Sequence, residues 1–341
     1  MKWLFLLSVL VGCAQVTSLN MRRHQFGRYP AKIVWFQVAG LAHEHLAMLR
    51  FGLPTLGDRT SFEQSTCTAQ AWSFSLTELR PHVAASMLAQ STGKKDQKKT
   101  CEDMRHRPIW NYLEGNGFKS GIIEIGALDD ESLLAAKTCG KAGKEFFGDA
   151  VFWSMAPAKP AGASEYLPQR PQEFKAERHY WDASCGPKGC GSSLQTAVSS
   201  LYGQFARNAD RHVLIVRDFS YRHALRRSDF TAAREILREI ERTVAAFYQA
   251  AESRSDVLVV VSGAASQELD FPAQGRDWQS FDLKGTGVQS RLSDLLVPVY
   301  AHGARAENFC GFYEENQIFE RVLSGPRQQG LELQVINPFL N

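Results

Sequence analysis

The chain has 341 residues, of which 44% are hydrophobic and 22% are charged, and its formal net charge is +3. These proportions are typical of a soluble globular protein and exclude collagen-like, disordered and polytopic membrane classes. The 39 Lys and Arg residues nearly balance the 36 Asp and Glu residues and are dispersed, so no basic arm or helix indicates binding to nucleic acid.

The first residues have the pattern of an export signal. Lys2 precedes an apolar run from Trp3 to Val11, which is too short to span a bilayer and is typical of a signal peptide. The run ends at Leu10-Val11-Gly12-Cys13, which resembles a bacterial lipobox, where the cysteine is acylated and becomes the new N-terminus. The alternative is an ordinary secretory signal followed by an unrelated cysteine.

Acylation at Cys13 would anchor the protein without a spanning helix. The residues that follow, Ala14 and Gln15, are not the Asp that retains many lipoproteins in the inner membrane. The sequence therefore predicts a signal peptide over residues 1–12, a polar tether over 13–30 and an exported protein. Its acylated Cys13 would hold it in the bacterial envelope, at the outer membrane, where it faces the periplasm or the surface.

Six further cysteines remain after Cys13, and an even number in an exported chain suits disulfide bonds. In the segment Cys185-Gly-Pro-Lys-Gly-Cys190 the glycines and the proline allow the loop to turn back on itself, which favours a bridge between Cys185 and Cys190. A zinc site is the alternative, although no second pair of cysteines or histidines accompanies it.

Apolar strands and amphipathic helices alternate along the chain and indicate an α/β fold. Continuous apolar runs predict strands that are buried on both faces, which is typical of a largely parallel sheet with helices on both sides. The predicted strands are 32–38, 120–125, 212–216, 256–261 and 297–301; helices are predicted near 110–113, over 231–252 and near 316–323. The folded domain is placed at 31–326 and a C-terminal tail at 327–341.

The segment from Val297 to Phe319 resembles the end of alkaline phosphatases, where a strand of the type VPVFAxG leads into GxxAxxFxGxxxNxxI. The strands ending at Val216 and Val261, separated by one long helix, are similar in order and spacing to the two metal-bearing strands of that family. The resemblance extends, with gaps, from Lys32 to Leu323. The resemblance implies an alkaline-phosphatase-like three-layer sandwich. Members of that family hydrolyse phosphoric esters at a site that holds two zinc ions and one magnesium ion.

The metal-ligand positions that the resemblance implies do not carry ligands in this chain. Alanine replaces the Asp of the family's GDG, arginines replace the Glu, Asp and His of EGxxIDxxxH, and alanines replace the Asp-His of TADH. These positions are Ala39, Arg217, Arg222, Arg226, Ala264 and Ala265. No His lies between His223 and His302 to supply the last ligand, and the phosphate-clamping arginine of the family would fall near Ala127. The resemblance therefore predicts that zinc and magnesium are not bound.

The nucleophilic serine of the family lies in TDSAAS at the N-terminus of a helix. The segment from Ser65 to Ala71 places Cys67 near that position, which makes Cys67 a candidate nucleophile. Cys67-Thr68 also resembles the start of the sulfatase motif, but the Ser and Arg of that motif are absent and conversion to formylglycine is not expected. A buried or disulfide-bonded Cys67 is the favoured alternative.

Arg217, Arg222 and Arg226 form the densest basic cluster, at the predicted C-terminal edge of the sheet. They are candidates for an anion-binding site, and solvated loop charges are the alternative. If they bind an anion, alanine at Arg217 or Arg222 should abolish binding and leave folding intact.

Two other polar groups have ordinary structural explanations. The spacing of His43 and His45 would point their imidazoles apart on a helix, which favours surface polar residues over a pair of metal ligands. Asp129-Asp130-Glu131 suits the start of a helix as well as it suits a cation.

Three functions are compatible with these patterns. The first is a non-catalytic, alkaline-phosphatase-like lipoprotein that serves as a binding or scaffold module for an anionic ligand or an envelope protein. The second is a hydrolase of phosphate or sulfate esters with a rearranged site. The third is an unrelated α/β surface protein.

Overall fold

The computed structural model describes residues 29–51, 53, 58–74, 79, 82–95, 97–187, 189–207, 209–272, 275–293 and 295–323. The predicted signal peptide, Cys13 and the predicted tail over 327–341 lie outside these ranges, as does the predicted tether except for Tyr29 and Pro30. Within the described ranges, no helix combines the length and the apolar character needed to cross a bilayer.

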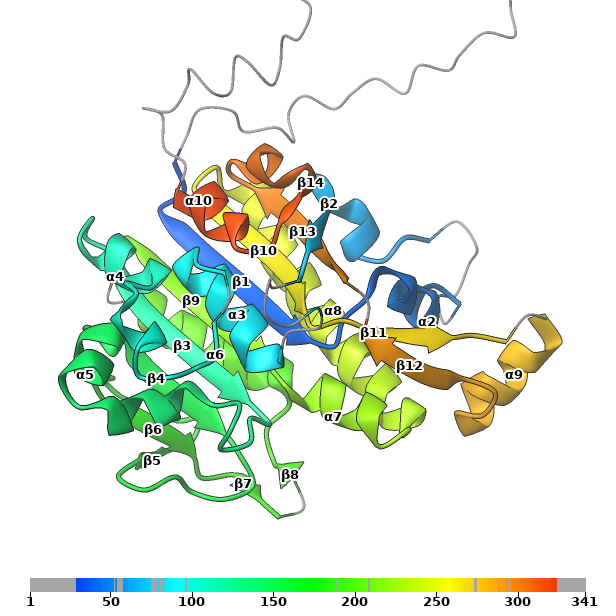
Figure 1. The fold of residues 1–341 in the computed structure, drawn as a ribbon, viewed down its shortest axis with the longest axis horizontal. Helices are drawn as coiled ribbons and strands as arrows, with labels where there is room; N and C mark the ends of the chain where they lie inside the picture. Colours follow the sequence, from blue (N-terminus) through cyan, green and yellow to red (C-terminus); the bar gives the residue numbers. More distant parts are fainter. Residues whose placement is uncertain are drawn as a thin grey trace, which may run out of the picture.

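A ten-stranded sheet forms the centre of the molecule, in the order β14-β2-β13-β10-β1-β9-β3-β4-β6-β5 (Figure 1). All neighbouring strands pair in parallel except that β13 runs antiparallel to both β10 and β2. The strands are β1 Lys32–Ala39, β2 Cys67–Trp72, β3 Lys119–Ile125, β4 Val151–Met155, β5 Ser164–Tyr166, β6 His179–Asp182, β9 His212–Asp218, β10 Val257–Ala264, β13 Leu296–Gly303 and β14 Gly311–Glu314.

Helices cover both faces of this sheet and complete three layers. Successive residues of β1 alternate between two cores: Val34 and Phe36 pack on the side of α6 and α8, and Ile33 and Trp35 pack on the side of α4 and α10. The helices are α2 Leu46–Arg50, α3 Val83–Thr92, α4 Ile109–Glu114, α5 Lys141–Phe147, α6 Leu194–Arg207, α7 Ser220–Arg226, α8 Phe230–Ser253, α9 Gly275–Lys284 and α10 Gln317–Leu323. The predicted α/β class and largely parallel sheet are confirmed.

Two short antiparallel pairs lie outside the main sheet. β11 (Gln267–Asp270) pairs with β12 (Gln289–Ser293), and together with α9 they project from one end of the molecule (Figure 1). β7 (Cys185–Gly186) pairs with β8 (Gly189–Cys190), and the disulfide between Cys185 and Cys190 closes this hairpin. The bridge expected from the sequence is therefore present.

The register of the sheet brings four strand ends to one edge. Ala39 pairs with Ala264, and Asp218 lies opposite both Val38 and Ile125. Because these strands are parallel, β1, β3, β9 and β10 end side by side, which is where open α/β sheets bind their ligands. Gly40 follows β1 with φ +80, and a Cβ there would come within 3.1 Å of the Cβ of Arg222. The absence of a side chain at Gly40 allows α7 to approach this edge closely.

Candidate functional site

The ends of β1 and β10 meet in a small apolar cluster. Its six members are at most 3% exposed, and Ala127 packs against them; they are Ala39, Val83, Met87, Phe219, Ala264 and Ala265. Strands β1 and β10 supply Ala39 and Ala264, the turn after β10 supplies Ala265, α3 supplies Val83 and Met87, and Phe219 follows β9. We refer to these residues as the apolar cluster.

The apolar cluster does not fit the metals that the resemblance implies. Zinc takes thiolate, imidazole or carboxylate ligands, and magnesium takes oxygen ligands. Alanine, valine and phenylalanine side chains offer none of these, and the Met87 thioether is a soft ligand that suits neither ion in such a site. Within the described ranges, no group of three or more His, Cys, Asp or Glu residues lies close enough together to hold a metal ion.

A network of charged side chains lies beside the apolar cluster. The guanidinium of Arg217 on β9 donates to the carboxylate of Glu124 on β3. The same carboxylate accepts from the hydroxyl of Ser132 and, at 2.9 Å, from the backbone N–H of Leu133. Arg217 and Glu124 are each only 1% exposed, so this is a buried ion pair whose acceptor is satisfied by several donors.

A second carboxylate, Glu131, lies on the outer side of this network. It is within 2.9 Å of Nε2 of His223 and 3.7 Å of Nη1 of Arg222, and it accepts from the backbone N–H of Leu128 at 3.2 Å. Burial pushes the pKa of Glu131 upward, but the bonds from His223 and Leu128 and the charge of Arg222 outweigh it, so its pKa is lowered. We refer to Glu124, Glu131, Arg217, Arg222 and His223 as the ionic cluster.

Phe219, a member of the apolar cluster, contacts the ionic cluster, since the guanidinium carbon of Arg217 lies 5.3 Å from the centroid of its ring. The preceding residue, Asp218, is buried and accepts from the Ser220 hydroxyl at 2.8 Å and from the Tyr221 N–H at 3.0 Å. Burial raises the pKa of Asp218 to about 6, although both hydrogen bonds oppose the shift. Sequence reasoning missed this residue because the resemblance directs attention to the position before it.

The three arginines differ in their surroundings. Arg217 is fully enclosed and paired with Glu124, Arg222 is mostly buried beside Glu131, and Arg226 is exposed at the end of α7. Burial is the main cause of the lowered pKa of Arg222, and the charge of Arg226 is the second cause. These two side chains therefore lie near one another. The expectation that Arg217→Ala leaves folding intact must be revised, because that change leaves the buried carboxylate of Glu124 without its cationic partner.

Cys67 is buried in a disulfide, the alternative that the sequence favoured, and the candidate position at a helix N-terminus is corrected. It is the first residue of β2, opposite Ala301 of β13, and it forms a disulfide with Cys310. A disulfide sulfur is not a free thiolate, so the position has no nucleophile in this state. The third bridge joins Cys101 to Cys139.

The helix that begins at the edge occupied by the apolar cluster is α3. It starts at Val83, and His82 caps it by accepting the backbone N–H of Ala84 on Nδ1. The run Ala84-Ala85-Ser86 repeats the last three letters of TDSAAS, and this signal could have located the helix from the sequence. The segment from Ser65 to Ala71 offers a competing match to the same motif.

His43 and His45 point to different partners, as their spacing predicted, but only His43 is a surface residue. His45 is fully buried, which corrects the expectation for that side chain. Nδ1 of His43 lies 3.0 Å from the hydroxyl of Tyr300, and Nδ1 of His45 lies 2.9 Å from that of Tyr221. Burial lowers the pKa of His45 to about 3, so its imidazole is neutral at neutral pH. Asp129 and Asp130 precede Ser132, which is the N-cap of the short 3-10 helix Leu133–Cys139.

Comparison with known proteins adds evidence on the fold. No protein-family profile and no curated protein sequence matches the chain at a significant level. The structure of alkaline phosphatase from Thermus thermophilus is 11% identical, covers 95% of this chain and 99% of its own, and has a TM-score of 0.67. Alkaline phosphatase from a psychrophilic Shewanella species is 12% identical, with coverages of 86% and 98% and a TM-score of 0.68.

A lipoteichoic acid synthase, LtaP from Listeria monocytogenes, is similar at a lower level. It is 11% identical, covers 86% of this chain and 72% of its own, and has a TM-score of 0.50. At such identities the likeness concerns the backbone and says nothing of the chemistry of the site. The chain thus has an alkaline-phosphatase/sulfatase-like α/β fold.

Proposed function

We propose that this protein is a non-catalytic member of the alkaline-phosphatase-like fold that acts as a binding or scaffold module in a bacterial envelope. The observation that carries the proposal is the apolar cluster at the ends of β1 and β10. In an active site of this fold these strand ends would carry metal-binding carboxylates and imidazoles. Here Ala39, Ala264 and Ala265 fill the same space with methyl groups, and Phe219 closes it.

The start of α3 supports the same proposal. If Ala84-Ala85-Ser86 corresponds to the end of TDSAAS, then His82 and Val83 stand where the family has Asp and the nucleophilic Ser. The Val83 side chain is fully buried and consists of an isopropyl group, which cannot attack phosphorus. Loss of the nucleophile and of the metal ligands together leaves the scaffold without the parts that the reaction requires.

The arginines give the proposed binding function its chemistry. Arg217 is neutralised by Glu124, so its charge replaces a missing cation inside the fold and does not serve a ligand. Arg226 is exposed, and Arg222 lies between it and Glu131. An anionic ligand or an acidic segment of an envelope protein would therefore meet Arg226 first, and Arg222 behind it.

An activity assay tests the catalytic part of the proposal. The purified chain, supplied with Zn²⁺ and Mg²⁺, is assayed with p-nitrophenyl phosphate and p-nitrophenyl sulfate next to an active alkaline phosphatase. We expect no release of p-nitrophenol above the buffer rate. Turnover that disappears in an Asp218→Asn variant would contradict the proposal and support the alternative, a phosphate- or sulfate-ester hydrolase with a rearranged site.

Fractionation tests the proposed location. With an intact lipobox we expect the protein in the membrane fraction, and Cys13→Ala should move it to the soluble fraction because the acyl chains are lost. Ser8→Ala, in the same predicted signal peptide, is the matched control and should leave the protein with the membrane. Retention of the Cys13→Ala variant in the membrane fraction would rule out the anchor.

A further inference from the structure

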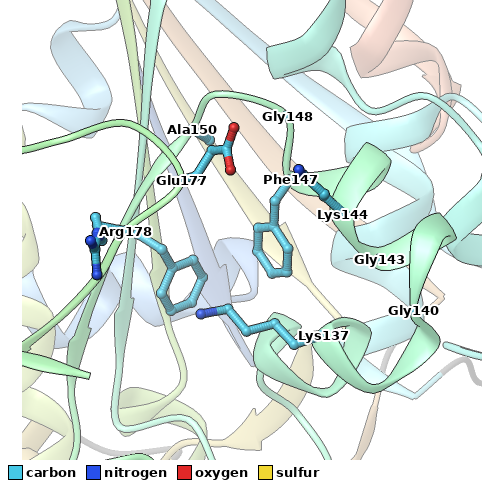
Figure 2. Close-up of a pocket in the computed structure, with 10 residues that line it drawn as sticks. Lys137, Gly140, Gly143, Lys144, Phe147, Gly148, Ala150, Glu177 and Arg178 are labelled. Atoms are coloured by element: carbon cyan, nitrogen blue, oxygen red, sulfur yellow. The ribbon is translucent and has the colours of Figure 1, made fainter. Parts of the chain in front are cut away.

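A small pocket lies at the opposite edge of the sheet from the apolar cluster, where β4 and β6 begin. Its cavity volume is about 200 Å³, and it is bounded by the 3-10 helix that carries Lys137, by α5 and by the segment that leads into β6 (Figure 2). Neither the proposed function nor the resemblance assigns a role to this place. Its volume is below that of drug-sized sites and suits a ligand with a single ring.

The floor of the pocket is aromatic. The rings of Phe147 and Phe152 meet edge to face, with centroids 5.7 Å apart and planes at 86°. The backbone N–H of Phe152 donates to the Arg178 carbonyl at 3.0 Å and that of Ala150 to the Phe147 carbonyl at 3.1 Å, and Ala150 adds a buried methyl group. Phe147 and Phe152 are 7% and 2% exposed, so a flat ring entering the pocket would contact the small apolar surface that they leave open, in the edge-to-face geometry that aromatic pairs prefer.

The rim of the pocket is basic. Three cationic side chains, Lys137, Lys144 and Arg178, line it together with a single carboxylate, that of Glu177. Figure 2 shows Arg178 on the other side of the hollow from Lys144. Nζ of Lys137 lies 5.9 Å from the centroid of the Phe147 ring. Among the described residues, no Asp or Glu forms an ion pair with Lys137, Lys144 or Arg178.

The positive charge at the rim comes from the lysine and arginine side chains and not from the imidazole of His179, which lies behind them. His179 is buried next to Phe152, with Nε2 2.9 Å from the Ser154 hydroxyl. Burial, with a contribution from the charge of Lys137, lowers the pKa of His179 to about 4, so it is neutral at neutral pH. Partial burial also lowers the pKa of Lys137, although its side chain reaches the surface.

The walls of the pocket are fixed before any ligand arrives. The disulfide between Cys101 and Cys139 holds the segment between Lys137 and Gly140. Glu177 has φ +60, a conformation that non-glycine residues rarely adopt and that is found at ligand-binding positions more often than elsewhere. A preformed pocket loses little conformational entropy when it binds a small molecule.

From these contacts we infer that the pocket binds a small aromatic carboxylate, with its ring on Phe147 and Phe152 and its carboxylate at Lys137. Lys144 and Arg178 add attraction at the mouth, and Glu177 disfavours ligands that carry a second negative charge on that side. The inference is independent of the proposed function, because the two sites lie at opposite edges of the sheet.

Calorimetric titration with benzoate tests this site. We expect benzoate to bind, acetate to bind more weakly because it lacks the ring, and benzylamine not to bind because its charge is reversed. Lys137→Gln should weaken benzoate binding about tenfold or more, the value expected for loss of one charge-assisted hydrogen bond. The control is Lys141→Gln, because the Lys141 side chain is 90% exposed and pairs with Glu145.

The affinities of the two variants and of the three ligands decide whether the site exists. Loss of benzoate affinity in Lys137→Gln, with affinity kept in Lys141→Gln, supports the site. Equal affinities in both variants, binding of benzylamine as tight as that of benzoate, or no benzoate binding to the unmodified chain at millimolar concentration would each overturn it. Circular dichroism of both variants verifies that they are folded, which is expected because both lysines are exposed at the surface.

Discussion

The apolar cluster and the ionic cluster lie side by side at one edge of the sheet, and they close that edge in opposite ways. In the apolar cluster, methyl groups and one aromatic ring fill the space at the ends of β1 and β10. In the ionic cluster, Glu124 and Glu131 each accept from several protein donors. One region lacks donor atoms for a metal, and the other already uses its carboxylates within the protein. Neither region therefore offers a metal ion a carboxylate that the protein does not already use.

The largest expected effect is in the ionic cluster. Arg217→Ala should reduce the free energy of unfolding by about 3–5 kcal/mol, because it leaves the Glu124 carboxylate buried and unpaired. Arg217→Met combined with Glu124→Leu should cost less than Arg217→Ala alone, since both charges are then removed. Arg226→Ala, at an exposed position, is the control and should stay within about 0.5 kcal/mol. Urea denaturation measures all three, and equal values for Arg217→Ala and Arg226→Ala would refute the buried pair.

A somewhat smaller effect is expected in the apolar cluster. Phe219→Ala should reduce the free energy of unfolding by about 3 kcal/mol, through lost burial and the cavity left behind. Urea denaturation at pH 8, above the pKa of about 6 of the neighbouring Asp218, measures this loss. A loss within about 0.5 kcal/mol would contradict the packing of Phe219 in this cluster.

The last expected effect reaches its full size only at higher pH and concerns Asp218, whose pKa is raised from its usual 3.8 to about 6 by burial. A carboxyl whose pKa is higher in the folded state stabilises the protein below its unfolded pKa, and this contribution is lost as the pH rises through about 6. Asp218→Asn removes the titration. The variant should therefore gain stability relative to the unmodified protein between pH 4 and pH 7, by up to about 3 kcal/mol. A difference that does not vary with pH would mean that Asp218 titrates normally.

The sheet could be predicted from the sequence because its strands are continuous apolar runs. β9, β10 and β13 lie where Val216, Val261 and the strand at 297–301 indicated, and α8 has the expected amphipathic face. The bridge between Cys185 and Cys190 followed from its short loop. In each case the signal lies within a few neighbouring residues.

Other features could not be predicted because their signals are not local. Every residue of α3 is buried, so this helix has no amphipathic stripe to reveal it. The pair of Arg217 and Glu124 joins residues 93 positions apart, and it requires knowledge that β3 and β9 are neighbours. The partner of Cys67 required a choice among many pairings of six cysteines.

The metal content of the purified protein most directly tests the central proposal, which is that this edge of the sheet binds no divalent cation. The protein is purified without chelators, equilibrated with zinc, passed through a desalting column and analysed by plasma mass spectrometry beside an active alkaline phosphatase. Zinc far below one ion per chain is the expected result, because Ala39, Ala264, Ala265 and Phe219 supply no ligands. Stoichiometric zinc that is lost in an Asp218→Asn variant would contradict the claim and place a metal site at the end of β9.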